Sequence, residues 1–223
     1  MSTRIRKENS MNTTEKSSVK TAQENLRESA PQQSARYSPE PLRNIPLSTL
    51  KRIAVNASTV EAGDCEILRQ QLGRYPRGLV GIGARCACGR PAVTITYPRL
   101  ASGEPFPTLF YLSLPWLVRE ISRIESSGGM QALNERLREG SQNYDPDLAR
   151  NHEQAHVSYI ERRNMLAQVP ELAGRSAGGM PDRVKCLHAL AGYTLAAGSG
   201  VTAIGDEALR LAGWNPEVCH CSA

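Results

Sequence analysis

The spacing of apolar residues divides the chain beyond about residue 57 into short strands followed by helices. Three segments bounded by Gly and Pro are typical of strands: 78–86, 92–98 and 108–114. In the second, Val93, Ile95 and Tyr97 alternate with Thr94 and Thr96, which indicates two different faces of a sheet. Because the connections between the segments are short, we expect a small antiparallel meander.

Helical spacing dominates the rest of this region. Helices are predicted at 59–73, 115–127, 130–140, 145–169, 181–197 and 206–212. Three of the starts carry proline in the first turn, at Pro115, at Pro146 after Asp145, and at Pro181 before Asp182. Residues 57–223 are therefore expected to form a single α+β domain, in which the small antiparallel β-meander is followed by several packed helices.

The N-terminal segment has a different composition. Residues 1–56 hold ten Lys or Arg against five Asp or Glu, whereas the other 167 residues hold seventeen of each. Up to about Pro46 the segment is rich in Ser, Thr, Gln, Asn, Glu and Pro, and it buries too little apolar surface to offset the entropy of ordering. We expect residues 1–56 to be a disordered basic tail, with a short helix near 46–55 as the lead into the domain.

Charge and hydropathy exclude several classes of protein. A neutral body lacks the basic footprint of a dedicated nucleic-acid-binding domain. No apolar run approaches the roughly 20 residues that span a bilayer, and the N-terminus lacks the hydrophobic stretch of a secretory signal. The expected location is therefore the cytoplasm, where the six cysteines act as thiols, metal ligands or catalytic groups.

One motif has the spelling of a metalloprotease zinc site. His152, Glu153 and His156 form His-Glu-x-x-His, which on a helix places both imidazoles on one face beside a glutamate base. Such a site needs a third ligand, and no Glu or His on the next helix is spaced to supply it. We therefore interpret the stripe through Leu148, His152, His156 and Tyr159 as the inward face of an amphipathic helix.

Cysteine and histidine also gather at three other points: Cys86-Ala-Cys88, Cys186-Leu-His188 and Cys219-His220-Cys221. Zinc prefers four nitrogen or sulfur ligands in a tetrahedron. On a continuous helix, side chains two residues apart point about 200° away from each other, so only one of Cys186 and His188 can reach a shared ion. Zinc is the candidate cofactor, and its candidate ligands are Cys86, Cys88, one of Cys186 or His188, and Cys219 or His156.

Two alternatives use the same thiols differently. The cysteines can fill the core as small apolar side chains. Alternatively, Cys86 or Cys88, beside Arg85 and Arg90, is a nucleophile with His156 as its base.

A separate candidate site binds an anion. Gly178 and Gly179 directly precede a predicted helix start, where free amides and the helix dipole favour negative charge. Arginines in Pro- and Gly-flanked loops, including Arg74, are expected to converge there. The proposed ligand-binding residues are Arg77, Arg99, Gly178, Gly179, Arg183 and Lys185, with His156 as candidate acid/base. The alternative is a Gly-rich hinge, with the arginines in surface ion pairs.

Several strings resemble a bacterial family, mostly of high-GC Gram-positives, known only as domain of unknown function number 501. They include QLGRYPRG, RCACGRP, SRIESSGGM, AHVSYIERR and GGMPDRVKCLH, and they cover about Asp64 to Cys219. In the family pattern the position of His156 is His, whereas that of His152 is typically another residue, which makes His-Glu-x-x-His a local coincidence. The family's gene neighbours, a septum-formation initiator and an exopolyphosphatase, favour phosphate chemistry or the cell envelope.

These observations favour a cytoplasmic protein that binds a phosphorylated or otherwise anionic small molecule and carries a cysteine-rich metal site. If it is an enzyme, phosphoester or phosphoanhydride hydrolysis is the first reaction to test. The alternative is a non-catalytic adaptor in cell-envelope or division processes, which would act through its tail and helical surface.

Overall fold

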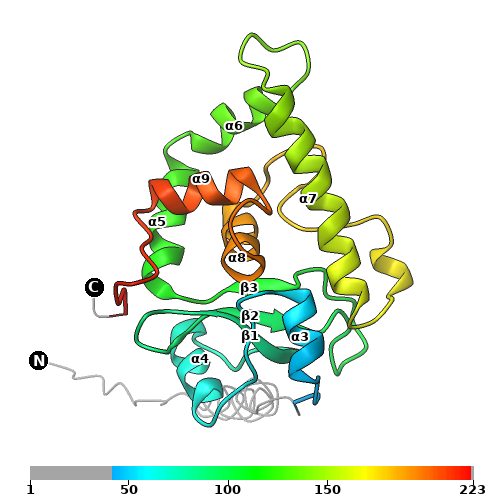
Figure 1. The fold of residues 1–223 in the computed structure, drawn as a ribbon, viewed down its shortest axis with the longest axis vertical. Coiled ribbons are helices and arrows are strands. Elements are labelled where there is room, and N and C mark those ends of the chain that lie inside the picture. Colours follow the sequence, from blue (N-terminus) through cyan, green and yellow to red (C-terminus); the bar gives the residue numbers. More distant parts are fainter. Residues whose placement is uncertain (1–41, 222–223) are drawn as a thin grey trace, which may run out of the picture. The chain divides into compact units, whose positions relative to one another are not determined.

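The computed structural model describes residues 42–221 (Figure 1). One antiparallel sheet has the strand order β1-β2-β3, with bounds Leu79–Arg85, Pro91–Thr96 and Phe110–Leu112. Before the sheet come α3 (Leu47–Ile53) and α4 (Asp64–Leu72). After it come α5 (Pro115–Ser126), α6 (Gly129–Leu137), α7 (Pro146–Asn164), the short 3₁₀ helix η2 (Pro170–Leu172), α8 (Leu187–Ala197) and α9 (Ala203–Leu211). The predicted α+β class, a small meander followed by helices, is confirmed.

Both faces of the sheet are covered, as Figure 1 shows for α4 on one side and α8 on the other. Leu68 of α4 packs on Leu79 and Ile82 of β1. All residues of β2 are buried, including Thr94 and Thr96 on the polar face that the sequence predicted. Because the sheet is covered on both sides, neither set of alternating side chains in β2 faces solvent. The two sets pack against different parts of the protein.

Helix α8 is the central element of the helical part. Its residues from Leu190 to Ala197 are all buried, and it contacts the three strands as well as α5 and α9. Glycines permit the close approaches. A Cβ on Gly83 would lie 3.0 Å from the Ala196 side chain, and one on Gly205 of α9 would clash with Thr194 of α8. The helix is apolar all round because protein surrounds it on every side.

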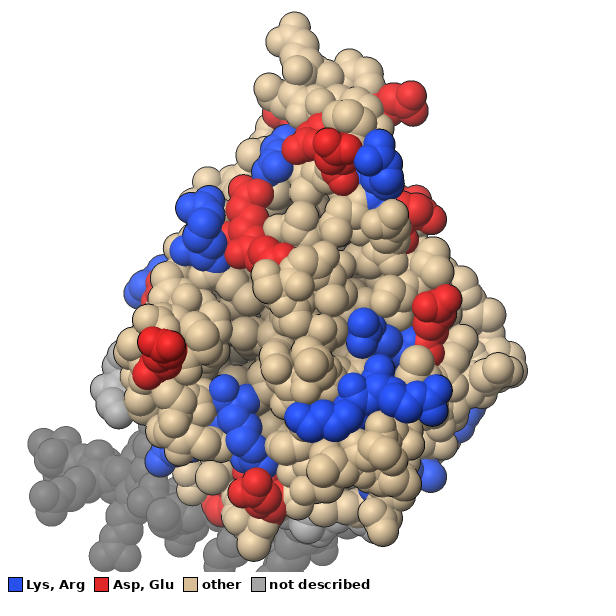
Figure 2. All heavy atoms as spheres, in the orientation of Figure 1, with Lys and Arg blue, Asp and Glu red and all other residues tan. Residues whose placement is uncertain are grey.

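The surface of the described region carries both signs of charge. On the face in Figure 2, Lys and Arg side chains gather over α3, while acidic and basic side chains are interspersed toward α6 and the start of α7. No helix among residues 42–221 combines the length and the apolar character that a membrane crossing requires.

The N-terminal boundary of the domain lies earlier than the sequence indicated. The expected tail covered residues 1–56, of which residues 1–41 lie outside the described part. Residues 42–56 include α3, where Leu50 and Ile53 are fully buried. The sequence predicts this stretch as a lead-in to the domain, yet Leu50 and Ile53 pack into the main core, whereas Leu47 is exposed. The domain therefore includes α3.

The helix predicted from Pro181 begins six residues later, at Leu187, so that prediction was wrong. Gly178 adopts a φ of +68° and Gly179 one of +97°, and the chain folds back so that the N–H groups of Lys185 and Cys186 donate to the Gly178 carbonyl at 2.6 and 3.2 Å. The backbone groups of Val184 pair with the Asn134 side chain. Because these groups already have partners, they do not enter a helix.

Candidate metal centre

The turn between β1 and β2 carries the first two thiols. Cys86 N–H donates to the Arg90 carbonyl at 2.9 Å, and the Cys86 carbonyl accepts from Gly89 N–H at 2.8 Å. Gly89 has a φ of +85°, a left-handed conformation that glycine adopts without strain. The tight turn leaves Cys86 buried and Cys88 exposed.

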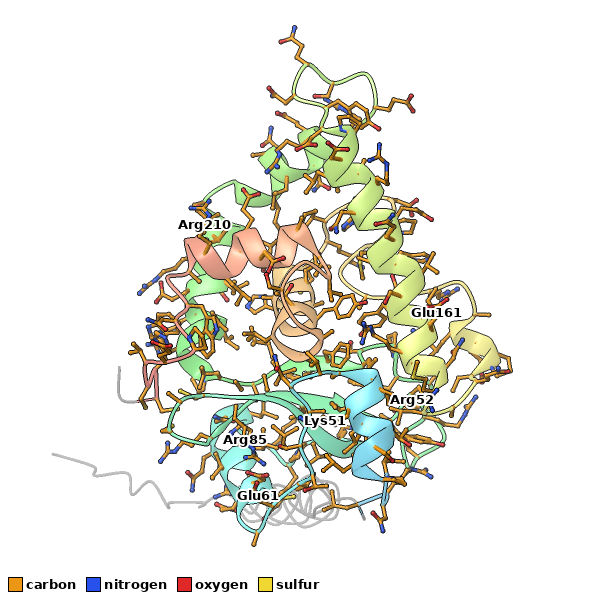
Figure 3. All side chains as sticks on the ribbon, viewed as in Figure 1. Lys51, Arg52, Glu61, Arg85, Glu161 and Arg210 are labelled. Atoms are coloured by element: carbon orange, nitrogen blue, oxygen red, sulfur yellow. The ribbon has the colours of Figure 1, made fainter. Side chains whose placement is uncertain are left out.

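Arg85 anchors the start of this turn. Its guanidinium binds both carboxylate oxygens of Asp64, at 3.0 and 2.8 Å, and donates to the Gly89 carbonyl at 2.9 Å. The hydrogen bond to Asp64 raises the pKa of Arg85. Figure 3 shows Glu61 on the same side of the sheet as Arg85, and the two side chains approach to 3.5 Å. A paired, largely buried guanidinium thus ties the turn to α4.

The segment after α9 (residues 214–221) runs past α5 to this turn (Figure 1). The His220 ring lies against both tryptophans of the chain, with ring centroids 4.0 Å from Trp116 and 5.0 Å from Trp214. The His220 N–H donates to the Cys86 sulfur at 3.3 Å. Aromatic stacking therefore holds the C-terminal segment beside the β1–β2 turn.

Four cysteines from these two segments form one group, which we call the four-cysteine group. Their sulfur atoms all lie within 4.8 Å of one another, and the members are Cys86, Cys88, Cys219 and Cys221. The Cys88 and Cys221 sulfurs are 3.4 Å apart, whereas a disulfide bond measures about 2.05 Å. In a zinc–thiolate tetrahedron with Zn–S bonds of about 2.3 Å, sulfurs lie roughly 3.8 Å apart. The group therefore has the dimensions of a four-thiolate metal site.

Crowding in the four-cysteine group opposes ionisation of its thiols. Burial raises the pKa of Cys221, and the neighbouring thiols of Cys88 and Cys86 raise it further. A divalent cation removes this opposition, because each bound thiolate then contacts positive charge. The amide donated to Cys86 is the kind of hydrogen bond that supports a metal-bound sulfur. The residues present fit zinc.

Sequence reasoning found three of these four residues and missed Cys221. The structure brings Cys86, Cys88 and Cys219 together as expected. Cys221 could have been found from the Cys-x-Cys spacing, which occurs at Cys86/Cys88 and again at Cys219/Cys221. Two such pairs together supply four sulfur ligands. The His220 ring lies against the tryptophans, and the cysteines on either side of it lie close to Cys86 and Cys88.

Two further predicted ligands, Cys186 and His188, lie elsewhere. Cys186 and His188 form a second group with Glu125, here called the Glu-Cys-His group, whose ligand atoms also lie within 4.8 Å of one another. The pKa of His188 is raised to about 9, first by its contact with the Cys186 thiol and then by Glu125 and the Val118 carbonyl, against the effect of burial. This group draws on none of the four cysteines above.

The His-Glu-x-x-His histidines do not belong to either group. His152 is 1% exposed, and its Nε2 lies 3.3 Å from the Arg183 carbonyl. His156 Nδ1 lies 2.9 Å from the Ser176 hydroxyl. Among the described residues no third ligand joins them, and Leu148 and Tyr159 are buried on the same helix face. The interpretation of this stripe as an inward helix face agrees with their burial.

The residues proposed for anion binding are arranged differently from expectation. Because α8 begins at Leu187, Gly178 and Gly179 do not present helix N-terminal amides. Arg183 and Lys185 are exposed. Arg77 pairs with Glu104 at 2.7 Å, and Arg99 pairs with Glu171 at 2.6 Å. The helix-dipole argument therefore does not apply at these glycines, and the two loop arginines form separate surface ion pairs; anion binding by these residues stays a prediction.

A cavity is lined in part by residues that flank the four-cysteine group in sequence, Arg85 and Pro216. Its volume is about 630 Å³, and it is bounded by the end of β1, the end of α8, one side of α9 and the start of the C-terminal segment. Its lining residues are Asn56, Ala84, Arg85, Thr194, Leu195, Gly198, Ser199, Asp206, Leu209, Arg210, Trp214 and Pro216. His156, the candidate acid/base, is not among them. Small-molecule sites commonly have volumes of about 300 to 1,000 Å³.

Comparison with curated proteins finds no match, and comparison with solved structures finds none either. A family model does match, over residues 82–210. It includes Cys86 and Cys88 and the whole Glu-Cys-His group, and it ends before Cys219 and Cys221. Because the match covers more than half of the chain, the protein belongs to the family described as protein of unknown function, DUF501.

Proposed function

We propose that the four-cysteine group binds one zinc ion, which holds the C-terminal segment against the β1–β2 turn. The observation that carries this proposal is the proximity of four sulfur atoms from two segments far apart in sequence, with Cys88 and Cys221 separated by 133 residues. Four protein ligands leave no open coordination position, as in structural zinc sites. Thiolates of this kind persist in a reducing compartment, which supports the expected cytoplasmic location.

The zinc would also shape the cavity of about 630 Å³, which we propose binds a small anionic molecule. Ala84 and Arg85 directly precede Cys86, and Trp214 and Pro216 shortly precede Cys219, so the ion would fix two of the cavity walls. Arg210 supplies positive charge, and no carboxylate among residues 42–221 pairs with its guanidinium. Arginine binds phosphate and carboxylate groups through two parallel hydrogen bonds. Trp214 offers an apolar surface for the remainder of the ligand.

Metal analysis of the purified full chain tests the zinc proposal. The double variant Cys88→Ser/Cys221→Ser should lose about one equivalent of zinc relative to the unmodified protein, because two of four ligands are removed. Cys65→Ser is the matched control, since Cys65 lies on α4 outside both groups. Unchanged zinc content in the double variant would contradict the proposal, as would a disulfide between Cys88 and Cys221 in protein prepared with reductant.

Thermal denaturation with a panel of phosphate, polyphosphate, nucleotides and sugar phosphates tests the cavity. At least one compound should raise the melting temperature, and Arg210→Gln should abolish that rise. Arg150→Gln is the control, because Arg150 is an exposed arginine on α7 that does not line the cavity. If no compound stabilises the protein, or if Arg210→Gln keeps the effect, the ligand proposal fails and the adaptor alternative gains support.

A further inference from the structure

The Glu-Cys-His group joins two helices that are distant in sequence. Glu125 lies near the end of α5, Cys186 is the N-cap of α8, and His188 lies in the first turn of α8. His188 Nδ1 is 3.1 Å from Glu125 Oε1 and 3.9 Å from Cys186 Sγ. In a tetrahedral zinc site, nitrogen, oxygen and sulfur ligands lie roughly 3.3 to 3.6 Å from one another. The three atoms are thus spaced as ligands of one ion.

The late start of α8 makes this arrangement feasible. Cys186 has φ −152° and ψ 113°, an extended conformation, and the helix begins at the next residue. The 200° separation expected for residues two apart holds only inside a continuous helix. Since Cys186 precedes the helix, its side chain reaches the same point as that of His188.

Hydrogen bonds from the surrounding backbone orient the side chains of His188 and Glu125. His188 Nε2 lies 3.1 Å from the Val118 carbonyl, which can only accept, so Nε2 carries a proton that it donates. Nδ1, which faces Glu125 and Cys186, is then the ring nitrogen that a metal would bind in place of a proton. The Glu125 Oε1 atom accepts the Leu187 N–H at 2.6 Å. A metal-bound histidine typically donates its second N–H to a backbone carbonyl or carboxylate in this way.

We propose that Glu125, Cys186 and His188 form a second zinc site, with a fourth coordination position open to water or a small anion. Three protein ligands with one open position are typical of catalytic zinc sites. The His188 and Glu125 side chains are 23% and 25% exposed, so the open position is accessible from solvent. This site is separate from the four-cysteine group and does not depend on the function proposed for that group.

The geometry favours a metal over a catalytic thiol at the same place. In a Cys-His-Glu triad the thiol and the carboxylate contact opposite nitrogens of the imidazole, because the ring passes a proton between them. Here both Cys186 and Glu125 approach Nδ1, and a backbone carbonyl occupies Nε2. A single ion bound by all three residues requires that the Cys186 sulfur and the Glu125 carboxylate lie near the same nitrogen of His188.

Zinc stoichiometry of the full chain separates the two sites. The unmodified protein should bind about two zinc ions per chain, and Cys88→Ser/Cys221→Ser should retain about one. Adding Glu125→Gln or His188→Gln to that double variant should remove the remaining ion. His156→Gln in the same background is the control and should keep it. Retention of the ion in both the Glu125 and His188 variants would overturn the second site, whatever the result at the four-cysteine group.

Two further measurements need no ligand variant at this site. In the Cys88→Ser/Cys221→Ser protein, added zinc should slow alkylation of Cys186, and rapid alkylation unaffected by zinc would identify a free reactive thiol instead. Cobalt bound to the same protein should show a single-thiolate absorption band that shifts when azide is added. No cobalt binding overturns the site, and a spectrum insensitive to azide overturns the open position.

Discussion

The C-terminal segment and the loop from Gly178 to Cys186 are both irregular, yet different interactions hold them. In the C-terminal segment, side chains make the main links to the rest of the protein, through the stacked His220 ring and the four sulfur atoms. In the loop, backbone groups pair with one another and with Asn134. Backbone groups that are paired locally leave few contacts for a ligand except at Cys186, where the loop ends, whereas the C-terminal segment depends on what binds its thiols.

The largest expected effect is at the C-terminal segment. The Cys88→Ser/Cys221→Ser variant should lose about 4 kcal/mol of unfolding free energy, because the metal closes a long chain loop much as a disulfide does. Hydrogen exchange should accelerate at residues 214–221 and remain slow at residues 178–186. Equal acceleration in both segments would mean that they are not held independently.

A smaller effect is expected when the support of the loop is removed. Asn134 accepts from Val184 N–H at 2.7 Å and donates to the Val184 carbonyl at 3.0 Å, and Val184 is 2% exposed. Asn134→Ala leaves both backbone groups without partners and should cost about 2 kcal/mol in chemical denaturation. Gln131→Ala on the exposed side of α6 is the control. Loss of zinc at the four-cysteine group in the Asn134 variant would contradict the separation of the two regions.

Acid should weaken the same loop through His152. Burial lowers the pKa of His152 below its usual 6.5, and its Nδ1 has no hydrogen-bond partner among the described residues. The folded state therefore favours the neutral ring, so its contribution to stability is complete above pH 6.5 and is lost as the pH falls. A single proton limits the slope to about 1.4 kcal/mol per pH unit. Denaturation of His152→Gln should show a shallower fall between pH 6.5 and 5, and an unchanged slope would assign the titration to another group.

The smallest effect is expected at the surface arginines. Arg99 and Glu171 form an ion pair whose side chains are 35% and 51% exposed. Arg99→Gln should change the unfolding free energy by less than about 1 kcal/mol, because solvent screens exposed pairs. Phosphate-induced stabilisation should also be unchanged. A larger loss of unfolding free energy, or loss of the stabilisation by phosphate, would indicate that Arg99 takes part in a ligand site.

Local pattern determined which segments form strands and helices, and some of the helix starts. Pro115 and Asp145–Pro146 begin helices where the sequence predicted them, since a first-turn proline and an aspartate cap act within a few residues. Pro181 carried the same signal and failed, because Asn134, 50 residues away, binds the backbone that a helix would have used. A proline and an aspartate in the first turn give no information about a side chain so far away in the sequence.

The amino-acid sequence by itself determined the α+β class, the meander and the identity of most candidate metal ligands. Only the tertiary structure decided their grouping: Cys221 completes one site, and Cys186 and His188 join Glu125 in another. The reason is physical. Spacing within a helix or strand fixes the direction of neighbouring side chains, but the meeting of side chains more than 60 residues apart depends on how α5, α8 and the C-terminal segment pack.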